Sequence, residues 1–385
     1  MISSGVTTVQ HLQSRAPGNL ASVLDQSNKI IAAYKQIGMR ASYSFALRDQ
    51  NRMIYDSDEN CLALLPPKHR PTLKKYFESF RLSISEQLEI FNILTEQHAK
   101  NNLIEIQLAP SNLHWLSDKA LETISKVAID TGAKIHMHLL ETPYQAEYAR
   151  RRTGQSALEY IDKFGLLGPQ LTIGHGVWMT EDDADLLAES GGCLCHNCSS
   201  NLRLKSGKAD LSSFLSKNIP IALGIDEAGI NDDRDRLQEM RLAYTLHRRP
   251  GHSSLNPSAA EILRMATEHG AASTPFSGKI GRLEKGLFAD ILLLDLQSLA
   301  FPYQDFDIPL LDIIVRRAKR KSVDTVIIDG NVVFNKGKFT RVDKDTLLEE
   351  ISKVLSRAKT PEEVELKELS EIIMPAVKNF YSGWY

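Results

Sequence analysis

The sequence predicts an α/β protein in which parallel strands and crossover helices form a TIM-like (β/α)8 barrel. Short runs of β-branched and aliphatic residues alternate with amphipathic stretches, a pattern typical of strand–helix–strand units. Several runs end in a histidine or an aspartate, and residues at the carboxyl ends of barrel strands meet on one face. The strands are expected near residues 6–9, 40–46, 104–109, 134–139, 171–174, 192–196 and 220–224.

Two of the intervening helices are placed by their capping signals. Residues 118–130 are amphipathic and follow Ser117, a favourable N-cap residue. Residues 180–190 begin with Thr180 as the N-cap and Glu181 in the first turn, where a negative charge complements the helix dipole. Only seven strands can be placed, so we expect a barrel whose first strand is missing.

The pattern of the sequence changes after about residue 280. Residues 289–294 and 323–334 have the composition of strands, and Asp329-Gly330-Asn331 interrupts the second one with a tight-turn signal. The last part of the chain is charged and helical in pattern. We therefore expect a barrel domain (1–280), a small C-terminal β-sandwich remnant (281–345) and a C-terminal helical segment (346–385).

Composition and charge limit the class of protein. The 385 residues are 42% hydrophobic and 24% charged, as in ordinary globular proteins. The formal net charge of -2 gives no support to a polyanionic partner, and the basic run 316–321 is expected to be a solvated helix face. No apolar run approaches the roughly 20 residues that span a bilayer. No signal-peptide pattern is seen and the four cysteines suggest no disulfide framework. We expect a cytoplasmic protein without nucleic-acid or membrane partners.

Three of the expected strands lead into side chains that bind metals or move protons. His138 lies in one such run, with Glu141 just beyond it, and His175 and Asp226 follow two later runs. Imidazoles and carboxylates hold catalytic metal ions, and an acid/base group beside them moves protons. This set predicts a metal-assisted hydrolase. The nearby Asp232, Asp233 and Asp235 are expected only to line a loop or to cap a helix.

These segments resemble the metal-dependent amidohydrolases of the cytosine deaminase and chlorohydrolase-like branch, which includes guanine, S-adenosylhomocysteine and triazine deaminases. One motif alone would be weak, but the joint order and spacing of the motifs is specific. The similar segments are residues 4–9, His138 with Glu141, His175, residues 195–204 (where Cys198 usually reads as proline), Asp226, residues 239–241 and residues 286–291.

The resemblance implies a role for each of these residues. His138 and Asp226 would be metal ligands, and Asp226 would also act as a base. His175 would orient or polarise the attacking hydroxide, and Glu141 would contact the substrate and carry a proton to the leaving nitrogen. Residues 104–109 contain no lysine that could bridge two metals. We therefore expect one divalent metal ion, zinc, with iron as the alternative.

The implied reaction is hydrolysis of a non-peptide carbon–nitrogen bond by a metal-bound hydroxide, in particular deamination of an aminated heterocycle or a related small molecule. Asn112, His114 and Trp115, after the fourth expected strand, are candidates for substrate binding. His136 points to the same side of its strand as His138, because the two are two residues apart. Whether His136 contacts the metal or the substrate is left open. The identity of the substrate and the formation of a homo-oligomer are also left open.

One motif of the family is absent. The family's first strand ends in a His-x-His pair that supplies two metal ligands and would lie several dozen residues before Gly5. The pair formed by His136 and His138 belongs to the fifth-strand motif instead. We expect a fragment or late-start product of a longer enzyme. The alternative is a catalytically impaired fragment or degenerate homologue that serves as a binding or oligomerising subunit.

The cysteines near residue 195 raise a rival interpretation. Cys195-x-x-Cys198 has the spacing of a redox pair or of half a thiolate zinc site, with Cys193 and His196 beside it. A structural zinc site of this kind usually needs a second pair of ligands, and only Cys61 remains. The favoured interpretation is a buried seventh strand followed by a loop that shapes the pocket.

Overall fold

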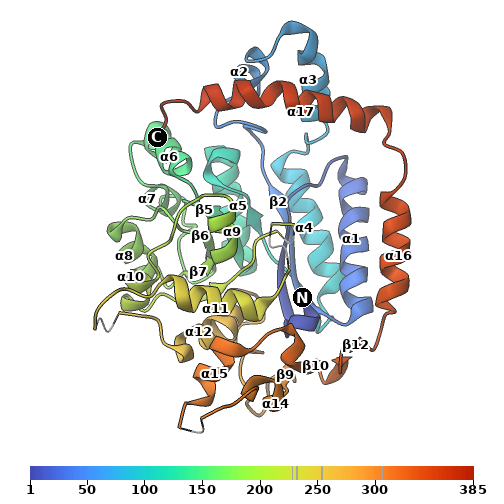
Figure 1. Ribbon diagram of the computed structural model, residues 1–385. Helices are drawn as coiled ribbons and strands as arrows, with labels where there is room; N and C mark the ends of the chain where they lie inside the picture. The colour runs from blue at the N-terminus through green and yellow to red at the C-terminus, as the bar shows by residue number, and fades with distance from the viewer. Residues whose placement is uncertain (228, 231–232, 253–254, 306) are drawn as a thin grey trace.

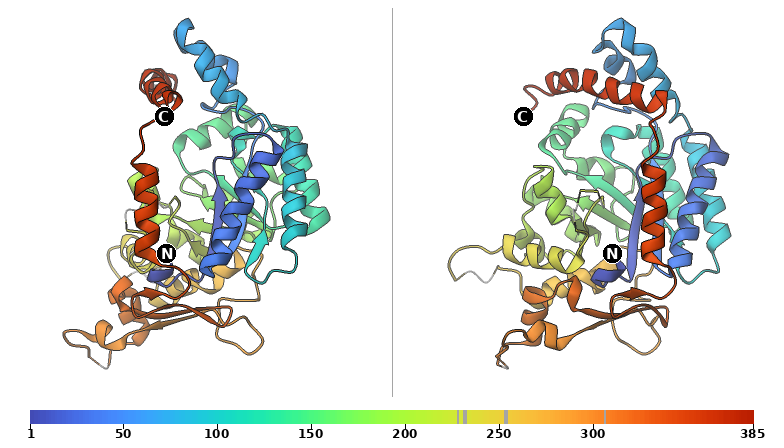
Figure 2. Two further views of the ribbon diagram at one scale, coloured as in Figure 1. Left: turned by 90° about the vertical axis from the view of Figure 1, so that its right-hand side faces the viewer. Right: turned by 45° about the vertical axis from the view of Figure 1, so that its right-hand side comes forward.

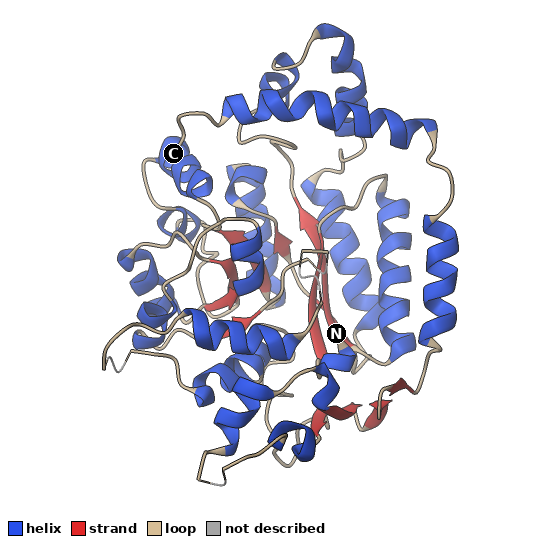
Figure 3. Ribbon diagram, in the orientation of Figure 1, coloured by secondary structure: helices blue, strands red, loops and turns tan. Residues whose placement is uncertain are grey.

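The computed structural model describes residues 1–385 except for 228, 231–232, 253–254 and 306. Helices surround a set of parallel strands, and a small antiparallel sheet lies below them (Figures 1 and 3). The parallel strands are β1 (Thr8–Gln13), β2 (Arg40–Leu47), β3 (Ile104–Ile106), β4 (Ala109–Pro110), β5 (Ile135–Leu139), β6 (Leu171–His175), β7 (Cys193–His196) and β8 (Ile221–Leu223).

The parallel strands follow one another in chain order. β1 pairs with β2, which pairs with β3 and β4, and β5, β6, β7 and β8 pair in sequence. A parallel bridge between Leu108 and Ile135 joins the two groups. Within the described residues β1 and β8 do not pair, so the arrangement is a barrel with a seam between its first and last strands.

All seven expected barrel strands are present, with two differences in detail. The first strand begins later than predicted, at Thr8, because the chain first forms a 3-10 turn, η1 (Ile2–Ser4), that Gly5 ends with a φ of 88°. The strand predicted at 104–109 is divided into β3 and β4. Between them the Gln107 N–H still donates to the Tyr43 carbonyl at 2.9 Å, so the chain stays beside β2.

Helices connect the strands and cover the outside of the barrel. The predicted caps are confirmed: Ser117 accepts from the Ala120 N–H at the start of α5, and Thr180 forms a capping box with Asp183 at the start of α8. The helices up to residue 272 are α1 (Leu20–Ile37), α2 (Asp58–Ala63), η2 (Pro67–His69), α3 (Arg70–Glu78), α4 (Ile84–His98), η3 (Leu113–Trp115), α5 (Asp118–Thr131), α6 (Pro143–Thr153), α7 (Ala157–Asp162), α8 (Glu181–Ser190), α9 (Cys198–Arg203), α10 (Leu211–Ser216), α11 (Arg236–Leu246), α12 (Ala259–Ala266) and α13 (Glu268–Ala272).

The later part of the chain adds an antiparallel sheet and more helices. The strands β9 (Ile291–Leu294), β10 (Val323–Ile328), β11 (Asn331–Asn335) and β12 (Lys338–Phe339) lie in the order β12-β11-β10-β9, and the predicted turn at residues 329–331 joins β10 to β11. The helices of this region are α14 (Leu296–Ala300), α15 (Leu310–Arg317), η4 (Arg320–Ser322), α16 (Lys344–Leu355) and α17 (Pro361–Phe380).

The last two helices differ in how they pack. α17 lies across the molecule beside α3, where Leu369 and Ile373 join a small apolar cluster with Leu73 and Phe77 (Figure 2). No residue of α16 is buried. Among the described helices, none combines the length and the apolar character needed to cross a membrane.

A buried ion pair connects the barrel to the antiparallel sheet. Arg40, at the start of β2, donates to both carboxylate oxygens of Asp290 at 2.8 Å, and neither side chain is more than 3% exposed. The guanidinium also lies 4.7 Å from the centre of the Phe288 ring and 5.1 Å from that of Phe276. Residues 286–291, one of the family-like segments, therefore place the carboxylate that neutralises a buried barrel arginine.

We predict that Arg40→Ala will lower the free energy of unfolding by about 3–5 kcal/mol, because it leaves the Asp290 carboxylate buried without its partner. Urea denaturation measures this change. Lys29→Ala is the control, since it removes an exposed ion pair with Asp25 and should have little effect. A small effect of Arg40→Ala, similar to that of the control, would contradict the role of the pair.

The seam between β1 and β8 predicts self-association, because open strand edges bind other strands. His269 shields part of the β8 edge, where its Nδ1 accepts the Ile221 N–H at 3.3 Å. We expect concentration-dependent association in size-exclusion chromatography with light scattering, and more of it in His269→Ala. His98→Ala removes another partly buried histidine, at the end of α4, and should change nothing. A monodisperse, cooperatively melting monomer in all three proteins would show that the seam is not an open edge.

Candidate active site

Three of the predicted site residues come together at the carboxyl ends of their strands. His138 lies near the end of β5, His175 ends β6 and Asp226 follows β8. One ligand atom from each side chain lies within 4.8 Å of the other two. The rings of His138 and His175 are 5.4 Å apart, and His175 Nε2 is 4.0 Å from Asp226 Oδ2. Two imidazoles and one carboxylate are a donor set that suits a catalytic divalent metal ion.

The backbone bends sharply where these strands end. Leu140, His175 and Asp226 all have positive φ angles, of 53°, 75° and 58°. Such conformations cost non-glycine residues about 1–3 kcal/mol each and occur often at functional sites. Here they turn the chain out of the strand at the point where each functional side chain must face the centre of the barrel.

His175 is held in one tautomer by Asn201 of α9. The Nδ1 of His175 lies 2.8 Å from Asn201 Oδ1, which can only accept a hydrogen bond, so Nδ1 carries the proton. With the proton on Nδ1, the Nε2 lone pair of the unprotonated ring is on the side that faces Asp226. This nitrogen can bind a metal ion or accept a proton.

Asp226 is positioned by α9 and by a close packing of strand ends. Ser200 Oγ donates to Asp226 Oδ2. Gly224, two residues earlier, lies so close to β7 that a Cβ there would be 1.8 Å from Asn197 Oδ1. A larger residue would force the Asn197 and Cys195 side chains to move, and the short distance brings Asp226 up to the residues that follow β7.

Glu141 lies beside the three ligand-type side chains and is held from two directions. Ser206 Oγ donates to its Oε1 at 3.3 Å, and Gln145 Nε2 donates to its Oε2 at 3.4 Å. Gln145 Oε1 also accepts the Glu141 backbone N–H at 2.8 Å. These contacts fix the direction of the carboxylate, and within the described residues no ion pair to it is seen.

Burial lowers the pKa of the histidines around this point, of which His138 is half-buried and His136 and His114 are buried. Burial lowers the pKa of His138, with a further lowering by His175 that Asp226 and Glu141 oppose. Burial also lowers the pKa of His136 and of His114 well below the usual range. Neutral imidazoles are the form that binds metal ions. His136 is not part of the group of three, because its ring lies deeper, against Gly174.

Apart from Glu141, the predicted substrate-binding residues lie at η3, which follows β4: Asn112 is its N-cap residue, and His114 and Trp115 are within it. His114 is fully buried, is stacked at 3.9 Å on Tyr55, and has no hydrogen-bond partner on either ring nitrogen within the described residues. Asn112 uses its side-chain oxygen to accept the Leu113 N–H at 2.7 Å. The Trp115 ring lies 4.3 Å from that of His114 and 5.7 Å from the Arg48 guanidinium.

Several residues that shape the site were not predicted. Asn201 lies in a segment that the sequence analysis had singled out (195–204), but its contact with His175 could not be inferred from that motif. Tyr55 comes from a long connection before α2 and links His114 to α17, because the Tyr55 N–H donates to the Tyr381 hydroxyl at 2.9 Å. Nothing in the sequence around Tyr55 indicated this. Of the three aspartates set aside earlier, Asp235 caps α11 and Asp232 lies outside the described residues.

Comparison with known proteins now gives the family. Residues 1–333 match the amidohydrolase family. The chain belongs to this family. A 5'-deoxyadenosine deaminase of Methanopyrus kandleri is 33% identical over 64% of this amidohydrolase and 56% of its own length. A 5-methylthioadenosine/S-adenosylhomocysteine deaminase of Clostridium tetani is 29% identical over 70% of this chain and 62% of its own length. The chain therefore spans less than two thirds of the length of these curated relatives.

Solved structures show the same fold. An adenosine deaminase from Xanthomonas campestris with bound zinc superposes with a TM-score of 0.75 at 25% identity, over 91% of this chain and 71% of that one. An atrazine chlorohydrolase from Arthrobacter aurescens complexed with zinc superposes with a TM-score of 0.78 at 20% identity, over 92% of this chain and 74% of that one. The predicted fold class and the predicted branch of the amidohydrolases are confirmed.

Proposed function

We propose that this amidohydrolase is a metal-dependent deaminase of an aminated heterocycle, with His138, Glu141, His175 and Asp226 as its functional residues. The observation that carries the proposal is the convergence of His138, His175 and Asp226 within 4.8 Å at the ends of β5, β6 and β8. The names of the relatives narrow the substrate class to purine nucleosides with a 6-amino group, such as 5'-deoxyadenosine and 5-methylthioadenosine.

The residues present fit a divalent metal ion. His138 and Asp226 would be ligands, and the free Nε2 of His175 would face the same point. Nitrogen and carboxylate donors suit zinc, and iron is the alternative. Two of the similar solved structures are described as containing zinc. When bound, the ion supplies Lewis-acid activation of a water molecule at neutral pH.

Glu141 would move the protons of the reaction. In a hydrolytic deamination the water oxygen bonds to the carbon that carries the amino group, and the carbon–nitrogen bond breaks to release ammonia. Glu141 would take a proton from the water and hand it to the departing nitrogen. Ser206 and Gln145 hold the carboxylate in the direction that this transfer needs. Asp226 would act as a second base, oriented by Ser200.

His114 would bind the heterocycle. Neither ring nitrogen of this buried imidazole has a partner among the described residues, so the ring can offer one donor and one acceptor to a ligand. Burial keeps the pKa of His114 well below the usual range, so the ring would bind in its neutral form. Trp115, whose ring lies beside that of His114, would also contact the heterocycle. Asn112 would contribute its amide nitrogen, because its side-chain oxygen already accepts the Leu113 N–H.

We predict that Glu141→Gln will lower deamination by at least about 100-fold while zinc content stays near that of the unchanged protein, because a proton carrier and not a ligand is removed. Asp226→Ala should reduce both. Ammonia release from a panel of 6-amino purine nucleosides and metal analysis of the dialysed protein measure the two effects. Equal loss of metal in both variants would show that the separation of ligand and proton carrier is wrong.

A second prediction concerns the ligands themselves. His138→Ala should weaken zinc binding by at least about 10-fold, because the site loses one of few protein ligands. His136→Ala, a matched change on the same side of the same strand, should leave zinc affinity nearly unchanged. Competition with a chromogenic chelator gives both affinities. If the two variants lose affinity equally, His136 is a ligand as well and the proposed set is incomplete.

The alternative function is a binding or oligomerising subunit without catalysis. The same panel separates the two. Zinc-loaded protein that binds nucleosides but releases no ammonia from any of them would favour that alternative over the deaminase.

A further inference from the structure

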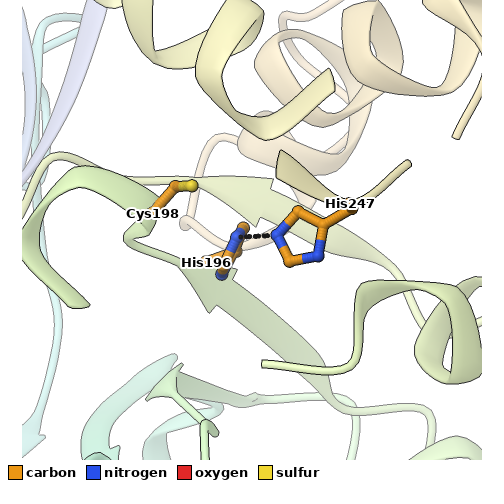
Figure 4. Close-up of side chains that lie close together, drawn as sticks. All are labelled: His196, Cys198 and His247. Atoms are coloured by element: carbon orange, nitrogen blue, oxygen red, sulfur yellow. Dashed lines mark hydrogen bonds between the residues drawn. The ribbon is translucent and has the colours of Figure 1, made fainter. Parts of the chain in front are cut away.

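A second cluster of metal-binding side chains lies outside the group formed by His138, His175 and Asp226. His196 ends β7, Cys198 begins α9 and His247 follows the last turn of α11 (Figure 4). All three are buried, with exposures of 1%, 1% and 3%. One ligand atom of each lies within 4.8 Å of the other two.

The geometry of the two histidines is close to that of a metal site. Their Nε2 atoms face each other at 3.0 Å (Figure 4). Two nitrogens bound to a tetrahedral zinc ion by bonds of 2.0–2.1 Å lie about 3.3 Å apart. A shift of a few tenths of an ångström would therefore convert the hydrogen bond between the rings into a pair of metal bonds, with the Cys198 sulfur beside them.

The surroundings of the cluster favour a cation. The carboxylate of Glu239 is 1% exposed and accepts the Ser199 N–H at 2.9 Å, directly after Cys198. A divalent ion would stabilise both a thiolate and the carboxylate.

We propose that His196, Cys198 and His247 form a second metal site, which binds a divalent ion of the zinc type through two imidazole nitrogens and one thiolate. Binding releases the thiol proton to solvent, and a water molecule completes the coordination. The mixture of soft sulfur and borderline nitrogen donors suits zinc or cobalt better than magnesium or calcium.

The site would fix the helix that supports the catalytic residues. Cys198 is the first residue of α9, and the same turn carries Ser200, which bonds Asp226, and Asn201, which bonds His175. An ion held between Cys198 and His247 would tie α9 to the end of α11. It would thus stabilise the arrangement of Asp226 and His175 without touching the substrate.

Cobalt titration of the reduced, metal-free protein under argon tests the proposal. Cobalt bound to a thiolate gives a sulfur-to-metal charge-transfer band in the near ultraviolet, whereas cobalt bound to His138, His175 and Asp226 cannot. We expect this band in the unchanged protein and its loss in Cys198→Ser, together with the loss of about one equivalent of bound metal. Cys193→Ser, another buried cysteine of β7 outside the cluster, should keep both.

X-ray absorption on the zinc-loaded, unchanged protein gives an answer that depends on no variant. A sulfur scatterer at about 2.3 Å is expected for this site. Zinc surrounded only by nitrogen and oxygen, or a charge-transfer band that persists in Cys198→Ser, would overturn the proposal and leave His196 and His247 as a hydrogen-bonded pair. Both signals report a bond between the metal and sulfur. Their outcome therefore does not depend on whether the deaminase proposal is correct.

Discussion

The alignment of β5, β6, β7 and β8 is the constraint on which the whole site depends. Their parallel register sets Leu139 opposite His175, and His196 opposite Leu223, so that the strands end at the same level. A slip of one residue would turn side chains to the opposite face of the sheet. A slip of two would keep the face but move His138 by about 6.6 Å relative to its neighbours. Either change separates the three ligand-type groups, so the chemistry depends directly on backbone pairing.

α9 transmits this constraint to the individual side chains. The helix is short and its N-cap residue, Asn197, makes no side-chain capping bond. Glu239 of α11 does so instead, by accepting the Ser199 N–H. The family-like segment 239–241 thus has a structural explanation, because it sets the start of the helix whose Ser200 and Asn201 hold Asp226 and His175. Glu239 of α11 therefore influences the orientation of Asp226 and His175 through α9, without contacting either side chain itself.

The sequence was most informative where local pattern and chemistry coincide. Strand runs that lead into His138, His175 and Asp226 could be recognised because each combines β-branched residues with a functional end. The first strand was misplaced because the turn at Gly5 delays pairing until Thr8, which composition does not reveal. The partnership of His196 with His247 was missed because their contact joins a strand end to a helix end across 51 residues. The stacking of Tyr55 on His114 likewise depends on how a long connection folds back. Contacts of this kind are set by tertiary packing and leave no periodic signal.

The bidentate contact between Arg40 and Asp290 also determines how the molecule can be divided. The barrel strands and the antiparallel sheet resemble separate modules in the ribbon (Figure 1), yet each contains one half of a buried charge pair. A recombinant barrel cut before residue 290 would carry the Arg40 guanidinium without its carboxylate partner, and the excised sheet would carry a carboxylate that keeps the Asp329 N–H but loses its cation. Exchange of the sheet with that of another protein would need a carboxylate at the same place. The two parts therefore form a single unit for expression and engineering, whatever their separate outlines suggest.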